Sequence, residues 1–88
     1  MKLVSVEWED SIQPASDWQW VSEYKPETIP QCVSVGYLIQ DSKTQKSIAP
    51  NLAFCEDSDD VQMSGVIHIP TKAIKKTTII GEIEFDYE

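Results

Sequence analysis

The chain has 88 residues and carries 15 acidic side chains against 7 Lys and no Arg, which gives a formal net charge of −8. This length allows one small domain over residues 1–88, and an apolar content of 41% is too high for a disordered acidic tail. The charge argues against a general nucleic-acid binder, because such proteins use Lys and Arg to neutralise phosphates and release counterions. We therefore expect no direct DNA binding.

Apolar runs are short along the whole chain. No stretch of about 18 apolar residues is present, so we expect no membrane span. The segment from Met1 to Glu7 lacks the apolar region of a signal peptide. These features predict a cytoplasmic protein.

The N-terminal part of the chain predicts one strand followed by one short helix. Residues 3–8 alternate between apolar and polar side chains, so one face of this strand carries Val4, Val6 and Trp8. Ser16 and Gln19 have the spacing of a helix-capping box, and Pro26 prevents a helix from continuing. We therefore predict a short helix over about 17–24, between the first and second strands.

Residues 33–54 predict a long β-hairpin around a four-residue loop, Ser42 to Gln45. In this register the numbers of opposed residues add up to 87, and the pairs near the tip are Asp41 with Lys46 and Gln40 with Ser47. Farther from the tip, one apolar face pairs Ile39 with Ile48, Tyr37 with Pro50, Val35 with Leu52, and Val33 with Phe54. Pro50 is expected to bend the second strand.

The C-terminal part predicts two strands joined by a tight turn. The first ends at Pro70 and is marked on one face by Met63, Ile67 and Ile69. Residues 70–73 suit a single helical or 3₁₀ turn. High β-propensity over 77–87 predicts the last strand, with an apolar face of Ile79, Gly81, Ile83, Phe85 and Tyr87. The element order predicts a mainly β fold: a single small five-stranded SH3-like or Sm-like barrel, partly open, with the short helix after its first strand.

The residue pattern also resembles a group of small uncharacterised bacteriophage proteins. The resemblance covers most of residues 4–74 and rests on Val4-x-Val6-x-Trp8-x-Asp10, Trp18, Cys32–Ile39, Ile48–Asn51 and Gly65–Pro70. It implies a phage gene product that acts in the cytoplasm of a bacterial host, and it brings no catalytic motif. The acidic tail 82–88 lies outside the resemblance.

Eight of the fifteen acids lie in two clusters. The first is the loop 56–60, with Glu56, Asp57, Asp59 and Asp60. This loop lacks the spacing of an EF-hand calcium loop, so it is either a solvated turn or a protein-binding patch. The second cluster is one face of the last strand, where about 6.8 Å separates successive members of the row Glu82, Glu84, Asp86 and Glu88. That row either prevents edge-to-edge aggregation, pairs with a partner or a second copy, or imitates nucleic-acid phosphates.

Few residues offer chemistry. His68 is the only histidine, and the strand pattern places it on the surface. The sequence identifies neither the orienting partner nor the substrate pocket that a catalytic base needs. Cys32 and Cys55 lie opposite each other in the predicted hairpin register. They are therefore either reduced packing residues, a cross-strand disulfide or a redox or metal pair, and the chain has too few other strong ligands for zinc.

The sequence predicts a non-enzymatic interaction protein without cofactor or metal. Trp8 and one of the other two Trp are expected to pack in the core, which leaves one Trp exposed beside acidic residues. The candidate binding residues are Trp18, Trp20, Glu56, Asp57, Asp59, Asp60, Glu82, Glu84 and Asp86. The expected partner is a host protein with a basic or nucleic-acid-binding surface, for example a component of a bacterial defence system that the protein inhibits.

Two further hypotheses remain open. One is an Sm-like oligomer, paired through the strand 77–87, that captures a nucleotide or another small ligand between subunits. The other is a minor virion or assembly component. The oligomeric state separates the first of these from a monomeric binding protein.

Overall fold

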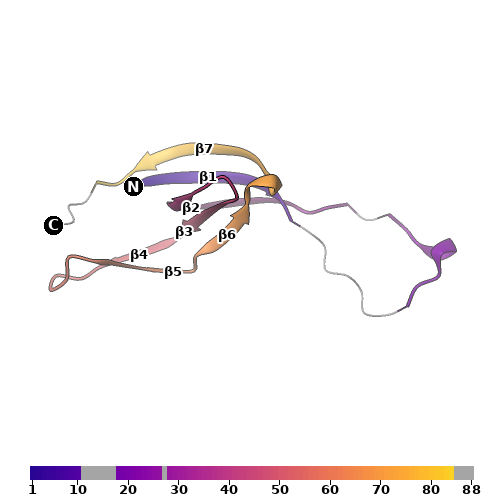
Figure 1. Cartoon of the computed structure of the whole chain (residues 1–88), viewed down its shortest axis with the longest axis horizontal. Helices are drawn as coiled ribbons and strands as arrows, with labels where there is room; N and C mark the ends of the chain where they lie inside the picture. The colour runs from indigo at the N-terminus through magenta and orange to yellow at the C-terminus, as the bar shows by residue number, and fades with distance from the viewer. Residues whose placement is uncertain (11–17, 27, 85–88) are drawn as a thin grey trace.

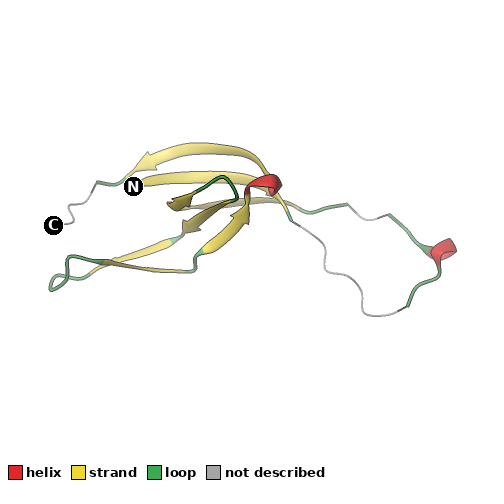
Figure 2. Cartoon of the chain, viewed as in Figure 1, coloured by secondary structure: helices red, strands yellow, loops and turns green. Residues whose placement is uncertain are grey.

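The computed structural model describes residues 1–10, 18–26 and 28–84. In these residues the chain forms seven β-strands and two 3₁₀ turns, and no α-helix (Figure 2). They are, in chain order, β1 (Lys2–Glu9), η1 (Val21–Glu23), β2 (Gln31–Asp41), β3 (Gln45–Ala49), β4 (Asn51–Phe54), β5 (Val61–Ser64), β6 (Ile67–Pro70), η2 (Thr71–Ala73) and β7 (Ile74–Glu82). The predictions of a mainly β fold and of a 3₁₀ turn after Pro70 are confirmed.

Five of the strands form one antiparallel sheet in the order β6-β3-β2-β1-β7, and β4 pairs with β5 in a separate hairpin (Figure 1). The turn η2 joins β6 to β7, although these strands are the two edges of the sheet. A flat five-stranded sheet holds its edges about 19 Å apart. Four extended residue steps span only about 14 Å. The sheet therefore curls and brings the end of β6 toward the start of β7, although the described strands do not close into a barrel.

A small apolar core lies on one face of this curled sheet. Its fully buried side chains are Val4, Val6, Ile48 and Ile69, and partly buried side chains packed against them are Trp8, Leu38, Ile67 and Ile74. The predicted core face of the first strand is thus confirmed. The indole Nε1 of Trp8 donates a hydrogen bond to Ser34 Oγ at 3.0 Å, so this polar group has a partner beside the core.

The β2–β3 hairpin follows the predicted register only near its tip. Asp41 lies opposite Lys46, with 2.7 Å between Oδ1 and Nζ, and Gln40 lies opposite Ser47. A β-bulge then leaves Ile39 without an opposed residue, and the register shifts by one. The pairs beyond the bulge are therefore Leu38 with Ile48 and Tyr37 with Ala49, rather than the predicted Ile39 with Ile48 and Tyr37 with Pro50.

The bulge also reverses which face of β2 meets the core. Farther from the hairpin tip than the bulge, Val35 lies opposite Ser5 of β1 and Val33 lies opposite Glu7. The predicted pairs of these two valines with Leu52 and Phe54 are therefore wrong. Val33 is 65% exposed and Val35 is half exposed. The physical reason is that β2 pairs with β1 over this stretch, and the face of β1 that carries Val4 and Val6 is the one that becomes buried.

Each of the next two predicted strands is divided into two shorter strands. Pro50 lies between β3 and β4, which confirms the predicted bend, and Gly65 lies between β5 and β6. Gly65 has a φ of +74°, which favours glycine, and a Cβ there would lie 3.0 Å from Pro50 Cγ. The chain therefore bends at the same level on both sides, and β4–β5 forms a hairpin separate from the sheet.

The helix predicted over 17–24 is wrong wherever the structure describes that segment; Ser16 and residue 17 lie outside the described residues. The chain from Trp18 to Pro26 contains only the short turn η1, and Trp20 at its N-cap makes no side-chain capping hydrogen bond. A helix this short is unstable in water unless an apolar face packs against the protein. All the described residues of the segment are exposed, so no such packing supports a helix.

The last strand is displaced relative to the prediction over 77–87. β7 begins at Ile74 and ends at Glu82, and two bulges interrupt its pairing with β1. One bulge separates Ile79, which lies opposite Val4, from Gly81, which lies opposite Leu3. The predicted apolar and acidic rows continue beyond Glu84. Their last positions lie outside the described residues: Phe85, Asp86, Tyr87 and Glu88.

Candidate functional site

Between β1 and β2 the chain leaves the sheet and returns to it. We call residues 18–26 of this excursion the aromatic arm. The backbone N–H of Asp10 donates to the carbonyl of Pro30 at 3.1 Å, so the excursion starts and ends at the same end of the β1–β2 ladder. Figure 1 shows that η1, within the arm, lies far from the sheet.

The arm presents large apolar side chains to solvent. Trp18 is fully exposed, Val21 is 93% exposed, Trp20 is 76% exposed and Tyr24 is 62% exposed. None of them belongs to the core cluster, so the expectation that one of Trp18 and Trp20 packs beside Trp8 is wrong. Clustered exposed apolar groups mark interaction sites, and Trp and Tyr are enriched among the residues that dominate binding energy. The arm is therefore the strongest candidate site in the described residues.

The two arm tryptophans flank a cleft. Trp20 has extended backbone angles, with φ −77° and ψ 131°. Trp18, Gln19 and Trp20 line an open cleft of about 350 Å³. The sequence placed both Trp residues among the candidate binding residues, but it did not predict the cleft that they line.

A second exposed element is the hairpin of residues 51–64, which we call the acidic hairpin. Its strands pair Leu52 with Met63 and Phe54 with Val61, so one face is apolar, and Phe54 is 56% exposed. Its tip holds the first acidic cluster, and all four acids there are exposed, as expected: Glu56, Asp57, Asp59 and Asp60. The backbone N–H of Val61 donates to Asp60 Oδ1 at 2.8 Å, which helps to hold the tip. The predicted acidic loop is thus the end of a projecting hairpin.

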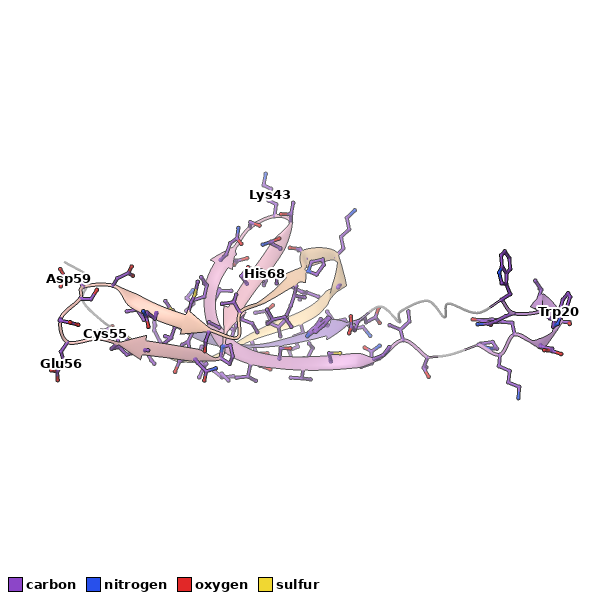
Figure 3. All side chains as sticks on the ribbon, turned by 90° about the horizontal axis from the view of Figure 1, so that it is seen from below. Trp20, Lys43, Cys55, Glu56, Asp59 and His68 are labelled. Atoms are coloured by element: carbon purple, nitrogen blue, oxygen red, sulfur yellow. The ribbon has the colours of Figure 1, made fainter. Side chains whose placement is uncertain are left out.

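The aromatic arm and the acidic hairpin lie at opposite ends of the molecule. Figure 3 shows Trp20 at one end of the long axis, with Glu56 and Asp59 at the other. The molecule measures 62 Å along that axis and 24 Å across. The exposed Trp residues and the acids of 56–60 therefore belong to two separate surfaces. Of the second acidic cluster, Glu82 and Glu84 are described, and both are exposed.

The predicted opposition of the two cysteines does not occur. Cys32 lies opposite Trp8 in the β1–β2 ladder, whereas Cys55 follows β4 at the exposed tip of the acidic hairpin. Both thiols are free. The bulge at Ile39 and the break at Pro50 cause this separation, because beyond them β2 and β4 pair with different strands.

The structure places a polar network around Ser47 that was not predicted from the sequence. This side chain is 2% exposed, and its Oγ lies 2.6 Å from His68 Nδ1 and donates to Gln40 Oε1 at 3.1 Å. Gln45 Nε2 donates to the same Gln40 oxygen at 2.9 Å. The only signal would have been the pairing of β3 with β6, which puts Ser47 opposite His68. A buried hydroxyl cannot reach a substrate, so the network satisfies a buried polar group rather than forming a nucleophile. His68 is exposed, as expected.

An ion pair lies near the base of the arm. Lys75 Nζ lies 2.8 Å from Glu9 Oε1, and Gln31 Nε2 donates to the same oxygen at 3.3 Å. The hydrogen bond from Lys75 is the main cause that lowers the pKa of Glu9 below its usual value, and Gln31 adds to it. Because the pKa of Glu9 is lower in the folded protein, its interactions with Lys75 and Gln31 stabilise the fold above the pKa of Glu9 in the unfolded chain. This stabilisation is lost as the pH falls through the pKa of Glu9 in the folded protein.

We expect Lys75→Gln to raise the pKa of Glu9 toward its ordinary value, because the substitution removes the largest cause of the shift. An NMR titration of the Glu9 side-chain carboxyl measures this pKa in both proteins. Lys76→Gln is the matched control, since it removes the same charge from the neighbouring exposed position of β7. An unchanged Glu9 pKa in the Lys75 variant would contradict the assigned ion pair.

Within residues 1–10, 18–26 and 28–84, no three His, Cys, Asp or Glu side chains lie close enough together to hold a metal ion. In the same residues no helix has the length and hydropathy required to span a bilayer. Comparisons with protein-family models, with curated proteins and with solved structures found no match. The functional argument therefore rests on the residues of this chain.

Proposed function

We propose that the protein is a non-enzymatic binding protein that engages a partner protein through the aromatic arm. The observation that carries this proposal is the exposure of Trp18, Trp20, Val21 and Tyr24 on one projecting segment. Burial of such side chains at an interface removes apolar surface from water, and this burial favours binding. The net charge of −8 favours a partner with a basic surface, since opposite charge accelerates association. The resemblance to phage proteins supports a partner that is a protein of a bacterial host, bound in the cytoplasm of that host.

We also propose that the curled sheet is an SH3-like or Sm-like barrel that stays partly open. Three features support this: β7 returns to pair with β1, β1 to β3 follow one another in the sheet, and a 3₁₀ turn precedes the last strand. The fold alone implies no function, so the binding proposal depends on the arm.

The test is capture of a partner by the wild-type protein and its loss in a double variant, Trp18→Ala with Trp20→Ala. The wild type should retain a stoichiometric protein from bacterial lysate, and the dissociation constant is then measured with that protein in purified form. Truncation of one hot-spot residue weakens binding about 30-fold or more, so the double variant should lose capture. Its thermal midpoint should match that of the wild type, because neither Trp belongs to the core.

Val33→Ala serves as the control, because Val33 is also exposed but lies on the sheet. This variant should keep the affinity of the wild type. Undiminished capture by the double Trp variant would contradict the proposal, as would the absence of any stoichiometric partner.

One observation favours a second function, that of an Sm-like oligomer with a small ligand between subunits. β7 is a nine-residue edge strand whose only described neighbour in the sheet is β1. Such an edge has backbone groups available for a second copy of the chain. Light scattering should then report a ring or dimer, and a strictly monomeric protein at high concentration would rule this function out.

A further inference from the structure

The cleft between Trp18 and Trp20 has the form of a clamp for a flat group. Trp18 and Trp20 line it, and only Gln19 between them completes the described lining. Its volume of about 350 Å³ lies at the lower end of the range of about 300–1,000 Å³ that is typical of small-ligand sites. Both indoles are exposed, so a group can enter from solvent without rearrangement of the core.

The chemistry of the lining selects cations. Trp has the strongest cation–π attraction of the aromatic side chains, because the face of its ring is negative. Of the two protein cations, Arg has the planar guanidinium that stacks on aromatic faces and is more weakly hydrated, so it loses less when it leaves water. A site with an indole on each side can contact both faces of that plane.

The charge of the neighbouring sequence points the same way. Residues 17–27 contain three acids and one Lys in the sequence, a net charge of −2, within a chain whose net charge is −8. Within the arm, the N–H of Glu23 donates to the carbonyl of Trp20 at 3.0 Å, which places this acid one tight turn after the clamp. Platforms that stack nucleic-acid bases combine aromatics with a basic groove, and this segment has the opposite charge. A negative environment attracts Arg and repels phosphates.

We propose that Trp18 and Trp20 clamp the guanidinium group of an arginine side chain presented by the partner protein. This inference rests on the proposed function, because the clamp belongs to the aromatic arm. It adds the chemical identity of the group recognised: an arginine in a basic segment, rather than an apolar side chain or a nucleobase.

The test compares fluorescein-labelled hexa-arginine and hexa-lysine peptides, which have equal charge, by fluorescence anisotropy at physiological ionic strength. The wild type should bind hexa-arginine more tightly than hexa-lysine. Trp18→Ala should weaken hexa-arginine binding by about 2- to 30-fold, the range that one cation–π contact supports. It should leave hexa-lysine binding much less affected. Val33→Ala is the control, because it removes an exposed apolar group that lies on the sheet, outside the aromatic arm and its cleft.

Each outcome decides the inference separately from the proposed function. Equal binding of the two peptides, or hexa-arginine binding unchanged in Trp18→Ala, would overturn the clamp. If the double Trp variant then still loses the captured partner, the arm binds that partner through apolar contacts and the proposed function stands. A preference for hexa-arginine that requires Trp18 and survives Val33→Ala supports the clamp.

Discussion

Replacing Ile48 by Ala should lower the free energy of unfolding by about 2–5 kcal/mol. Ile48 is 1% exposed in the central part of the sheet, with Leu38 opposite on β2 and Ile67 opposite on β6. The substitution removes three buried carbon atoms and leaves a cavity, because a small core relaxes only in part. An 88-residue domain has a total stability of about 4–13 kcal/mol, so the loss is a large fraction of it.

Urea denaturation followed by tryptophan fluorescence measures this effect as a lower midpoint with an unchanged m-value. Ile79→Ala is the matched control, because Ile79 is 59% exposed on β7. Its stability should change by less than about 1 kcal/mol. If the two variants lost equal stability, Ile48 would not belong to the core.

Gly36→Ala should destabilise the protein by about 1–3 kcal/mol. A Cβ on Gly36 would lie 2.9 Å from the carbonyl oxygen of Ala49 and 3.0 Å from its carbonyl carbon. These are backbone atoms, so β2 and β3 must move apart next to the Tyr37–Ala49 pair. The reason is close approach of two strands, since Gly36 does not have a positive φ.

Gly81→Ala provides the comparison for this prediction. A Cβ on Gly81 would lie 3.6 Å from a Leu3 side-chain atom, which is an ordinary contact. Both substitutions reduce the entropy of the unfolded chain by a similar amount, a stabilising effect of about 0.4–1 kcal/mol. The difference between the two variants therefore isolates the clash at Ala49, and equal unfolding midpoints would show that the strands have room for a methyl group.

Local features of the fold were predictable from the sequence. The alternation of Val4, Val6 and Trp8 identified the first strand and its core face, and the 3₁₀ turn after Pro70 was correctly placed. The tip of the β2–β3 hairpin was also correct, because a short loop determines the pairing of the residues next to it. These features depend on residues close together in the chain.

The arm shows why a locally favourable pattern can fail. A capping box and apolar residues three and four positions apart predict a helix, but a short helix needs a surface to pack on. The sheet offers the arm no such surface, since Trp18 to Pro26 are all exposed. Trp18 and Trp20 were both candidate binding residues, but only one of them was expected to be exposed, whereas both are.

The sequence by itself determined the composition of the two surfaces, the strand-forming segments and the bends at Pro50 and after Pro70. The tertiary structure decided which faces are buried, where the cysteines lie and that the arm and the acidic hairpin are far apart. The physical reason is the two-residue period of a strand: one bulged residue, Ile39, exchanges its faces, and no local pattern reports that exchange. Long-range pairing of β1 with β2 and β7 selects the face that buries Val4 and Val6.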